Sequence, residues 1–425
     1  MDIPIYLVRG RRMAETDPEM QHALAELHGS SERPRCLCVP GGVDMYIVRL
    51  DRWVLKRMPG TGGKHHPSCK SYEPEYDDSG LGELIGEALV DNGEELTEIF
   101  VNFSLKKGNR TNGTRGVATK PMEVKALKKK MSLRAVMHYL FDRAGFNRWS
   151  PAMEGKRNQG VVHKYLMEVA DSTMIKGAPL SQHLYVPEVF NEQRKSAIAE
   201  RRRNKLNSLH SHGDDGSTSM AIILGEFKGV AEAANGKKVF IKHMADMPLF
   251  IDEKSWKKIE RAFHASFLLK EADPAANFRL VMCALIYPKS ETAYLIHTAS
   301  MMTTTVHWIP VEDAHEAQLV HELINARRHF IKPLAYDSQH CARFATALLI
   351  DAGATPVPLH AVSTFWSEKE KEEKALALRG VTSAWVWNSD QPMPKLPDRL
   401  DGRRATPRPS ARTIQQHLDL GQSDT

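Results

Sequence analysis

Three of the five cysteines in this chain of 425 residues lie close to two adjacent histidines near the N-terminus. They form the frame Cys36-x-Cys38, followed by a long insert and then by His66-x-x-Cys69. A structural zinc ion binds four nitrogen and thiolate ligands in a tetrahedron, all of them from the protein. The insert is rich in β-branched and aromatic residues and is bounded by Pro-Gly turns, so we expect a β-hairpin that returns the second pair of ligands to the first. We therefore predict a structural zinc site at Cys36, Cys38, His66 and Cys69, with His65 as the alternative to His66.

The frame leaves two other interpretations open, because its spacing differs from the common CxxC…CxxC and CxxC…HxxxH patterns. Cys36 and Cys38 could be small side chains on a strand, or the cysteines could have a redox or catalytic role. Few, clustered cysteines indicate a reducing compartment rather than a disulfide framework. No apolar run is long enough for a membrane span and the N-terminus does not resemble a secretory signal, so we expect a cytoplasmic protein without membrane contact.

Positive charge is concentrated in the middle of the chain. The net charge is +6, but residues 105–205 contain 22 Lys and Arg against 8 Asp and Glu, a local charge of +14 (22 − 8). A basic block in an otherwise balanced chain is typical of a protein that binds a polyanion. We expect nucleic acid, with DNA favoured over RNA, bound mainly through its phosphates. The predicted contacts are Lys128, Lys129, Lys130, Lys156, Arg157, Lys164, Arg201, Arg202 and Arg203.

The basic stretch has the periodicity of two helices. Apolar residues recur at helical spacing from Leu133 to Ala144, with Ser132 as the predicted N-cap and Gly145 at the C-terminal end. A second helix is expected over residues 159–174, followed by a strand over residues 178–187. Helix, basic turn, helix and strand is the order of a winged helix-turn-helix, whose second helix contacts base edges near its N-terminus. The alternative is an ordinary packed helix pair with solvated lysines.

Changes in composition divide the chain into six segments. Residues 1–35 form a lead-in, 36–104 the zinc hairpin, 105–209 the basic helical domain and 220–389 an α+β domain. Residues 210–219 are rich in Gly and Ser and are predicted to be a flexible linker. Residues 390–425 are rich in Pro, Arg and Asp and are predicted to be disordered. The predicted fold class is α+β multidomain, with a zinc-type β-hairpin, a winged-helix-like middle and a C-terminal mixed α/β sheet.

Several segments resemble an uncharacterised bacterial protein family of about this length. They include RMPGTG from residue 57, HYLFDRAGFNRWSPAMEGKRNQG from residue 138, LGEFK, VFIKH and RHFIKPLAYD, and the resemblance covers most of residues 30–365. Members of that family occur on plasmids and on integrative, conjugative elements. The resemblance implies a cytoplasmic accessory protein of mobile DNA, with protein partners from the same element, and it transfers no catalytic residue to this chain.

The order of elements expected in the last third of the chain, helix–strand–strand–strand–helix–strand, is similar to that of the restriction-endonuclease-like core. That fold holds a divalent metal with carboxylates on its second and third strands. Here Ala345-Thr346 and His360-Ala361-Val362 stand at those places, which implies a binding scaffold or a degenerate nuclease. A nuclease would have to use Glu226 and Lys228, which share one face of a strand, together with Asp351. Cross-strand ion pairing also explains the Glu226 and Lys228 pair.

The sequence thus favours a zinc-stabilised, nucleic-acid-associated accessory protein over an enzyme. A metal-dependent nuclease is the alternative enzyme class. A protein–protein adaptor, whose basic block meets an acidic partner in conjugation or in maintenance of the element, is the third class.

Overall fold

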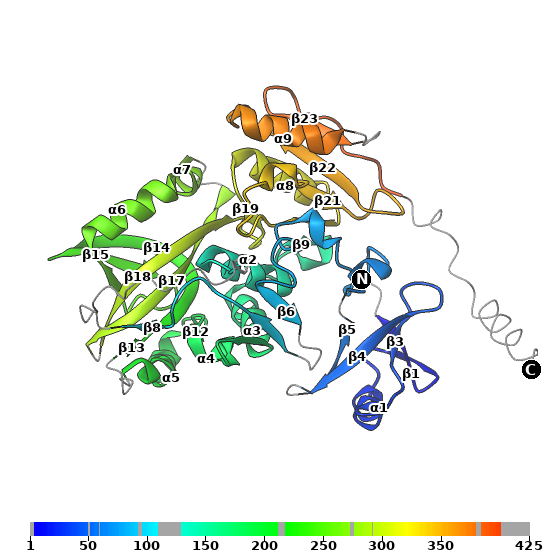
Figure 1. Ribbon diagram of the computed structural model, residues 1–425, viewed down its shortest axis with the longest axis horizontal. Helices are drawn as coiled ribbons and strands as arrows, with labels where there is room; N and C mark the ends of the chain where they lie inside the picture. Colours follow the sequence, from blue (N-terminus) through cyan, green and yellow to red (C-terminus); the bar gives the residue numbers. More distant parts are fainter. Residues whose placement is uncertain are drawn as a thin grey trace, which may run out of the picture.

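The computed structural model describes residues 4–49, 52–58, 60–91, 96–108, 129–210, 217–272, 276–290, 292–379 and 384–400. In these residues the chain forms a mixed α+β structure with several β-sheets, which confirms the predicted α+β class (Figure 1). None of the helices in these ranges combines the length and apolar character that crossing a membrane requires.

The N-terminal sheet includes most of the segment that was predicted to be a lead-in. Its strand order is β2-β1-β3-β4-β5, and β4 pairs with β5 as the antiparallel hairpin expected between the metal ligands. Helix α1 (Met20–Leu27) packs against this sheet. The structure differs from the prediction because β1 pairs with β3 and so supports the strand that carries Cys36. The strands are β1 (Ile5–Val8), β2 (Arg11–Ala14), β3 (Arg35–Cys36), β4 (Val43–Arg49) and β5 (Trp53–Arg57).

The two helices of the basic stretch begin at side-chain caps. The hydroxyl of Ser132 caps helix α2 (Leu133–Arg143), as predicted, and Gly145 follows this helix with φ +74°. The side chain of Asn158 caps helix α3 (Gln159–Asp171). Both helices share a core with a sheet of order β11-β10-β7-β6. Its strands are β6 (Leu89–Asp91), β7 (Thr97–Ile99), β10 (Thr173–Ile175) and β11 (Ala178–Pro179).

Residues 178–187 do not form the single strand that a winged helix needs. They form β11, the short helix α4 (Leu180–His183) and β12 (Leu184–Tyr185). Because β12 pairs in parallel with β14 of the largest sheet, the chain leaves the two helices at the point where a wing would return to them. A longer polar helix, α5 (Lys195–Asn207), follows.

The largest sheet closes on itself as a barrel. Strand β14 (Ala221–Ala233) pairs with β15 along one edge and with β17 along the other. Strand β16 joins β15 to β18, and β17 pairs with β18, so the ring is complete. Ile223, Val239 and Leu280 are among the side chains that fill its interior. The remaining elements are β15 (Gly236–Ile241), β16 (Leu249–Ile251), α6 (Glu253–Ala262), α7 (His264–Ala272), β17 (Arg279–Ser290) and β18 (Ala293–Thr304).

One hydrophobic core extends across the predicted boundary between the basic stretch and the C-terminal domain. Val136 of α2 and Leu166 of α3 belong to the same core as Ile222, Val281 and Met302 of the barrel strands. The basic stretch therefore has no core separate from the barrel in the described part of the chain. Of the predicted linker, residues 211–216 lie outside the described residues, and the strand β13 (Thr218–Ser219) pairs with β8 (Lys106–Lys107).

The C-terminal sheet has the strand order β23-β22-β21-β20-β9 and follows the predicted order of elements. Strand β9 (Arg148–Trp149), which comes from the basic stretch, pairs with β20 at the edge of this sheet. Strand β21 pairs antiparallel with both β20 and β22, whereas β22 and β23 are parallel. The elements are α8 (Ala314–Asn325), β20 (Phe330–Ile331), β21 (Ala347–Leu349), β22 (Val357–Val362), α9 (Glu368–Leu378) and β23 (Trp385–Asn388).

Residues 391–400 are ordered along the C-terminal sheet, in contrast to the predicted disorder. The indole Nε1 of Trp387 donates to the Gln391 carbonyl at 2.8 Å, and that of Trp385 donates to the Lys395 carbonyl at 3.0 Å. These bonds give the segment fixed partners that its polar composition does not reveal. Residues 401–425 of the predicted tail lie outside the described residues.

His138 of α2 is buried, and its protonation makes the stability of the folded chain depend on pH. Its Nδ1 accepts a hydrogen bond from the Tyr336 backbone N–H at 3.0 Å. Burial, and then the nearby positive charge of Arg134, lower the pKa of His138 to about 3. In the unfolded chain a histidine titrates near 6.5. Between these two values the unfolded chain binds a proton that the folded chain does not, so the folded state loses stability as the pH falls from about 6.5 toward 3.

We expect His138→Gln to reduce the pH dependence of stability in this range. The contribution of His138 to the slope of the unfolding free energy reaches about 1.4 kcal/mol per pH unit. Urea unfolding at several pH values between 7 and 4 measures the slope, with His22→Gln, a change at an exposed histidine, as the control. Equal slopes for the wild type and His138→Gln would contradict this account.

Candidate metal centre and nucleic-acid interface

The structure brings three thiols and one imidazole together beside the N-terminal sheet. The ligand atoms of Cys36, Cys38, His65 and Cys69 all lie within 4.8 Å of one another. The Sγ atoms of Cys36 and Cys69 are 3.7 Å apart, and His65 Nδ1 lies 3.3 Å from Cys38 Sγ and 3.8 Å from Cys69 Sγ. Ligands of a tetrahedral zinc ion are separated by about 3.4–3.8 Å, given its usual bond lengths. The donor set and its spacing therefore fit one metal ion.

Two backbone N–H groups support the sulfur atoms. The N–H of His66 points at Cys38 Sγ and that of Ser71 points at Cys69 Sγ, each at 3.4 Å. The turn that carries His65 is held by Gly62, since a Cβ at this glycine would lie 2.5 Å from the Cβ of Glu73. The absence of a side chain at this position lets the ligand-bearing turn pack directly on the following segment.

The imidazole in the cluster is that of His65, which corrects the preference for His66. The backbone at His65 is extended, so the side chains of adjacent residues point to opposite sides. His65 is buried against the thiols, whereas His66 is exposed and its Nδ1 lies 2.8 Å from Ser68 Oγ. His66 contributes its backbone N–H to the cluster and not its ring.

Hydrogen bonding within the cluster separates the pKa values of its thiols. Hydrogen bonds with Cys38 and Cys69, followed by burial, raise the pKa of Cys36. Hydrogen bonds from Cys36 and Cys38 lower the pKa of Cys69, which favours its thiolate form. Thiolate is the form of cysteine that binds a metal. Burial alone would lower the pKa of His65, but its bonds with Cys38 and Cys69 raise it to about 9.

Two of the predicted phosphate contacts, the partly buried Arg157 and the buried Arg202, are structural residues. Arg157 donates from Nη1 to the Phe146 carbonyl at 2.9 Å and from Nη2 to the Gly145 carbonyl at 3.0 Å, and it also bonds the carbonyls of Arg148 and His307. Burial lowers its pKa to about 10. Arg202 is 4% exposed and pairs with Asp246. These two assignments are corrected, because neither guanidinium is free to contact a phosphate.

The other predicted contacts within the described residues lie at the surface, in three groups. Lys129 pairs with Glu83 at 3.1 Å, beside the exposed Lys130, and Lys128 lies outside the described residues. Arg201 and Arg203 are exposed on α5, where Arg201 makes two hydrogen bonds with Glu188. Lys156 and Lys164 are exposed at the start of α3 and on its outer face.

The barrel carries two outward-pointing phenylalanines that the sequence analysis missed. Phe240 on β15 and Phe250 on β16 each lie between two interior residues, so their side chains point outward. Phe250 is the cross-strand partner of Lys238. All three are partly exposed, and neither phenylalanine belongs to a core cluster of the described residues. The alternation Lys-Val-Phe-Ile-Lys over residues 238–242 was the available signal.

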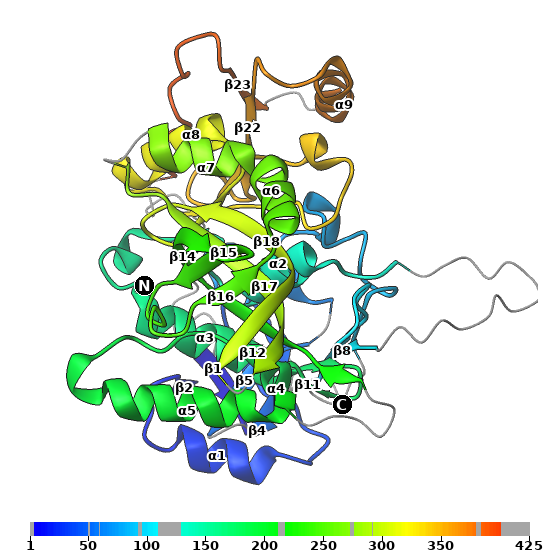
Figure 2. The ribbon, with the colours of Figure 1, turned by 90° about the vertical axis from the view of Figure 1, so that its left-hand side faces the viewer.

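Helix α5 packs against one end of the barrel. Arg202 bonds Asp246 in the connection between β15 and β16, and Leu206 and Leu209 pack into the barrel core. Figure 2 shows the barrel strands toward the viewer, with α6 above them and α5 below. Helices α2 and α3 cover the opposite side, over β14, β17 and β18. The outward side chains of β15 and β16 therefore lie apart from the main core, and the connection between the two strands meets the basic helix α5.

The residues proposed for a nuclease are not brought together. Glu226 accepts hydrogen bonds from Lys242 at 3.1 Å and from Arg279 at 2.8 Å, and Lys228 is exposed. Asp351 follows β21 of the C-terminal sheet and pairs with Arg328 at 2.8 Å, whereas Glu226 lies on β14 of the barrel. In the described ranges, the Cys/His cluster is the one group of metal-ligating side chains that converges.

The sequence pattern of one protein family, described as "Protein of unknown function (DUF1173)", matches residues 6–390. The chain belongs to this family. No curated protein and no solved structure matches the chain. The family description names no activity, so its function has to be inferred from the geometry of this member.

The cluster predicts which histidine is needed for metal binding. Elemental analysis of protein purified under reducing, chelator-free conditions should find about one divalent ion per chain. His65→Ala and Cys69→Ser should lose the metal because each removes a ligand. His66→Ala should keep it and serves as the matched control. Metal retained in His65→Ala and lost in His66→Ala would contradict the assignment.

Arg157 should contribute to stability rather than to nucleic-acid binding. Arg157→Leu removes a guanidinium group that donates to four carbonyl groups, and we expect it to lower the unfolding free energy by about 3 kcal/mol or more. Lys156→Leu, at an exposed neighbouring cation, should change it by less than about 0.5 kcal/mol. Urea unfolding measures both. A stable Arg157→Leu protein that no longer binds nucleic acid would restore the original assignment.

Proposed function

We propose that this protein binds single-stranded nucleic acid, with DNA favoured, on the outer face of β15 and β16, and that zinc in the Cys/His cluster stabilises its N-terminal sheet. In this proposal the protein is an accessory factor of plasmids and conjugative elements. Conjugation passes DNA as a single strand, which is the form that this surface suits.

The observation that carries the proposal is the strand order of the barrel. Counted along the chain, its five strands pair in the order 1-2-3-5-4-1, with the third and fifth strands parallel. Helices α6 and α7 lie between the third and fourth strands. Five-stranded Greek-key barrels of the oligonucleotide-binding type have this order and bind their ligands on the second and third strands. In this chain those strands are β15 and β16, which α2 and α3 leave uncovered.

The chemistry of this face suits a single strand. Exposed bases stack on aromatic side chains, and a basic groove follows the backbone. Phe240 and Phe250 would supply the stacking surfaces, and Lys238 would contact the nucleic-acid backbone beside them. Arg201 and Arg203 on α5 would contact phosphates along one border. A duplex is less favoured as the ligand, because the winged helix that was predicted to read one is not formed: β12 pairs with β14 instead.

Zinc is the metal that the donor set favours. Three thiolates and one imidazole in tetrahedral spacing are typical of a structural zinc site with no open position for a substrate. The cluster joins β3 to the segment after β5, and this part of the chain has a small core of its own. We therefore assign the metal a structural role and propose no nuclease, since no observation favours the residues that one would need.

Single-strand binding should depend on the two phenylalanines. We expect Phe240→Ala/Phe250→Ala to weaken binding of a fluorescent oligonucleotide by at least about tenfold, because each lost stacking contact costs about 1–3 kcal/mol. Phe365→Ala removes an aromatic ring that is 88% exposed on another part of the fold and should leave affinity unchanged. Fluorescence anisotropy with single strands and with duplexes of the same sequence measures the difference.

Salt dependence separates the phosphate contacts from stacking. Arg201→Ala/Arg203→Ala should lower the slope of log K against log salt concentration by about 1.4, or about 0.7 for each contact to a single strand. Lys369→Ala/Lys371→Ala removes the same charge from the acidic helix α9 and is the control. Equal binding by the phenylalanine variant and the wild type, or preference for the duplex, would overturn the proposal.

A further inference from the structure

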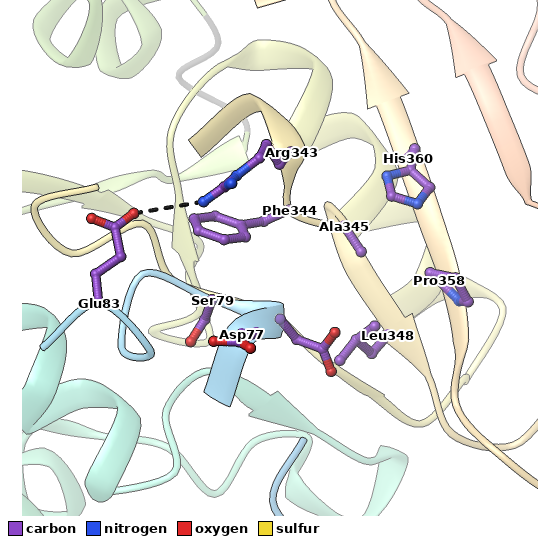
Figure 3. A pocket seen from close by; sticks show the side chains of 10 residues that line it. Asp77, Ser79, Glu83, Arg343, Phe344, Ala345, Leu348, Pro358 and His360 are labelled. Carbon is purple, nitrogen blue, oxygen red and sulfur yellow. Dashed lines mark ion pairs between the residues drawn. The ribbon is translucent and has the colours of Figure 1, made fainter. Parts of the chain in front are cut away.

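A cavity of about 560 Å³ lies between the segment that follows the metal cluster and the C-terminal sheet. One side is formed by Asp77, Asp78 and Glu83, and the other by Arg343, Phe344 and strands β21 and β22. Figure 3 shows Arg343 and His360 on one side of the space and Asp77 on the other. A volume of this size is in the range of small-molecule sites. No predicted or described function uses it.

Charges of both signs line this cavity. The lining carboxylates are Asp77, Asp78 and Glu83, and the lining cation is Arg343. Glu83 lies 3.9 Å from Arg343 and 3.1 Å from Lys129, which is outside the lining. Glu83 is thus neutralised locally, which leaves Asp77 and Asp78 as acceptors on their side. A ligand with donor groups at one end and an anionic group at the other would match this arrangement.

The cationic side includes a buried pair behind the cavity wall. Lys374 Nζ lies 3.0 Å from His360 Nδ1 and donates to the Phe344 carbonyl at 2.7 Å. Burial lowers the pKa of Lys374 to about 8, so it is still mainly charged at neutral pH, and burial with the Lys374 charge lowers that of His360 to about 4. The ammonium group therefore fixes a neutral His360 in the wall and adds positive charge behind it.

The acidic side is not a site for a single metal ion. In the described ranges, no three ligand atoms of Asp, Glu, His or Cys converge within 4.8 Å except those of the Cys/His cluster. The carboxylates and His360 are too widely spaced to share one ion. A flat organic ligand can instead span the distance and lie on the apolar part of the wall, where Phe344, Ala345 and Leu348 are found.

We propose that this cavity binds one nucleotide whose base carries an amino group. The base edge donates hydrogen bonds to Asp77 and Asp78, as exocyclic amino groups do to carboxylates. The ring lies against Phe344. The phosphate lies at Arg343, whose guanidinium extends toward Glu83 in Figure 3, since guanidinium groups bind phosphate oxygens well. The nucleotide is either free or the end of a strand, because both present the same groups. This inference does not depend on the barrel as a single-strand site.

Isothermal titration of the full chain with CMP and UMP tests the proposal, since cytosine has an amino group and an N3 acceptor where uracil has a carbonyl and an N3–H. We expect CMP to bind with a dissociation constant below about 1 mM and UMP to bind about tenfold more weakly. Asp77→Ala/Asp78→Ala should weaken CMP binding by about tenfold or more, and Phe344→Leu should weaken it too. Glu368→Ala/Glu372→Ala removes two carboxylates from α9 and should leave it unchanged.

A trinucleotide whose first nucleotide is a 5′-phosphorylated cytidine distinguishes the two sources. Tighter binding of the trinucleotide than of CMP identifies a strand end, and tighter binding of CMP identifies a free nucleotide; either result supports the site. No saturable binding of either ligand, equal affinity for CMP and UMP, or unchanged affinity in the aspartate variant would overturn it. The Arg201→Ala/Arg203→Ala protein should still bind CMP, so failure here and failure of strand binding on the barrel are separate results.

Discussion

The buried carboxylate of Glu73 holds the metal-bearing part of the chain to the helical core. It pairs with Arg57 at the end of β5 and with Arg143 at the end of α2. Burial, and then the charge of Arg143, lower the pKa of Arg57 to about 10, which reflects the cost of desolvating this guanidinium group close to a second one. Glu73 offsets this cost because it lies between them. Loss of such a carboxylate would leave two buried cations facing each other without a counter-ion.

The segment that contains Glu73 connects three features that would otherwise be independent. It begins at the metal ligand Cys69, passes through Tyr72, which packs on Ile331 and Leu348 of the C-terminal sheet, and continues to Asp77 in the cavity wall. A metal ion that fixes Cys69 therefore also restricts the position of one side of the cavity. The cluster is a structural element of the whole chain and not only of the N-terminal sheet.

The sequence predicted the metal frame and the cap of α2 because both depend on short-range spacing. It could not choose between His65 and His66, since adjacent residues differ only in the side to which an extended backbone turns them. It also wrongly predicted that Arg157 contacts phosphate, because the number of charged residues in a segment does not show which groups a guanidinium binds in the folded chain. Three carbonyls of the segment after α2 and the His307 carbonyl after β18 bind it, and their convergence depends on the packing of α2 against the barrel.

Most barrel strands were predictable one by one, but their order was not, since it depends on pairing between distant segments. The same non-local packing gives the arginines of α5 different roles. Neighbouring residues on a helix are about 100° apart, so burial of Arg202 against Asp246 turns Arg201 and Arg203 to either side of it, toward solvent. The arginine that was predicted to contact phosphate thus attaches the helix to the β15–β16 connection. Its burial leaves the two flanking arginines exposed on α5, near the end of the barrel where Asp246 lies.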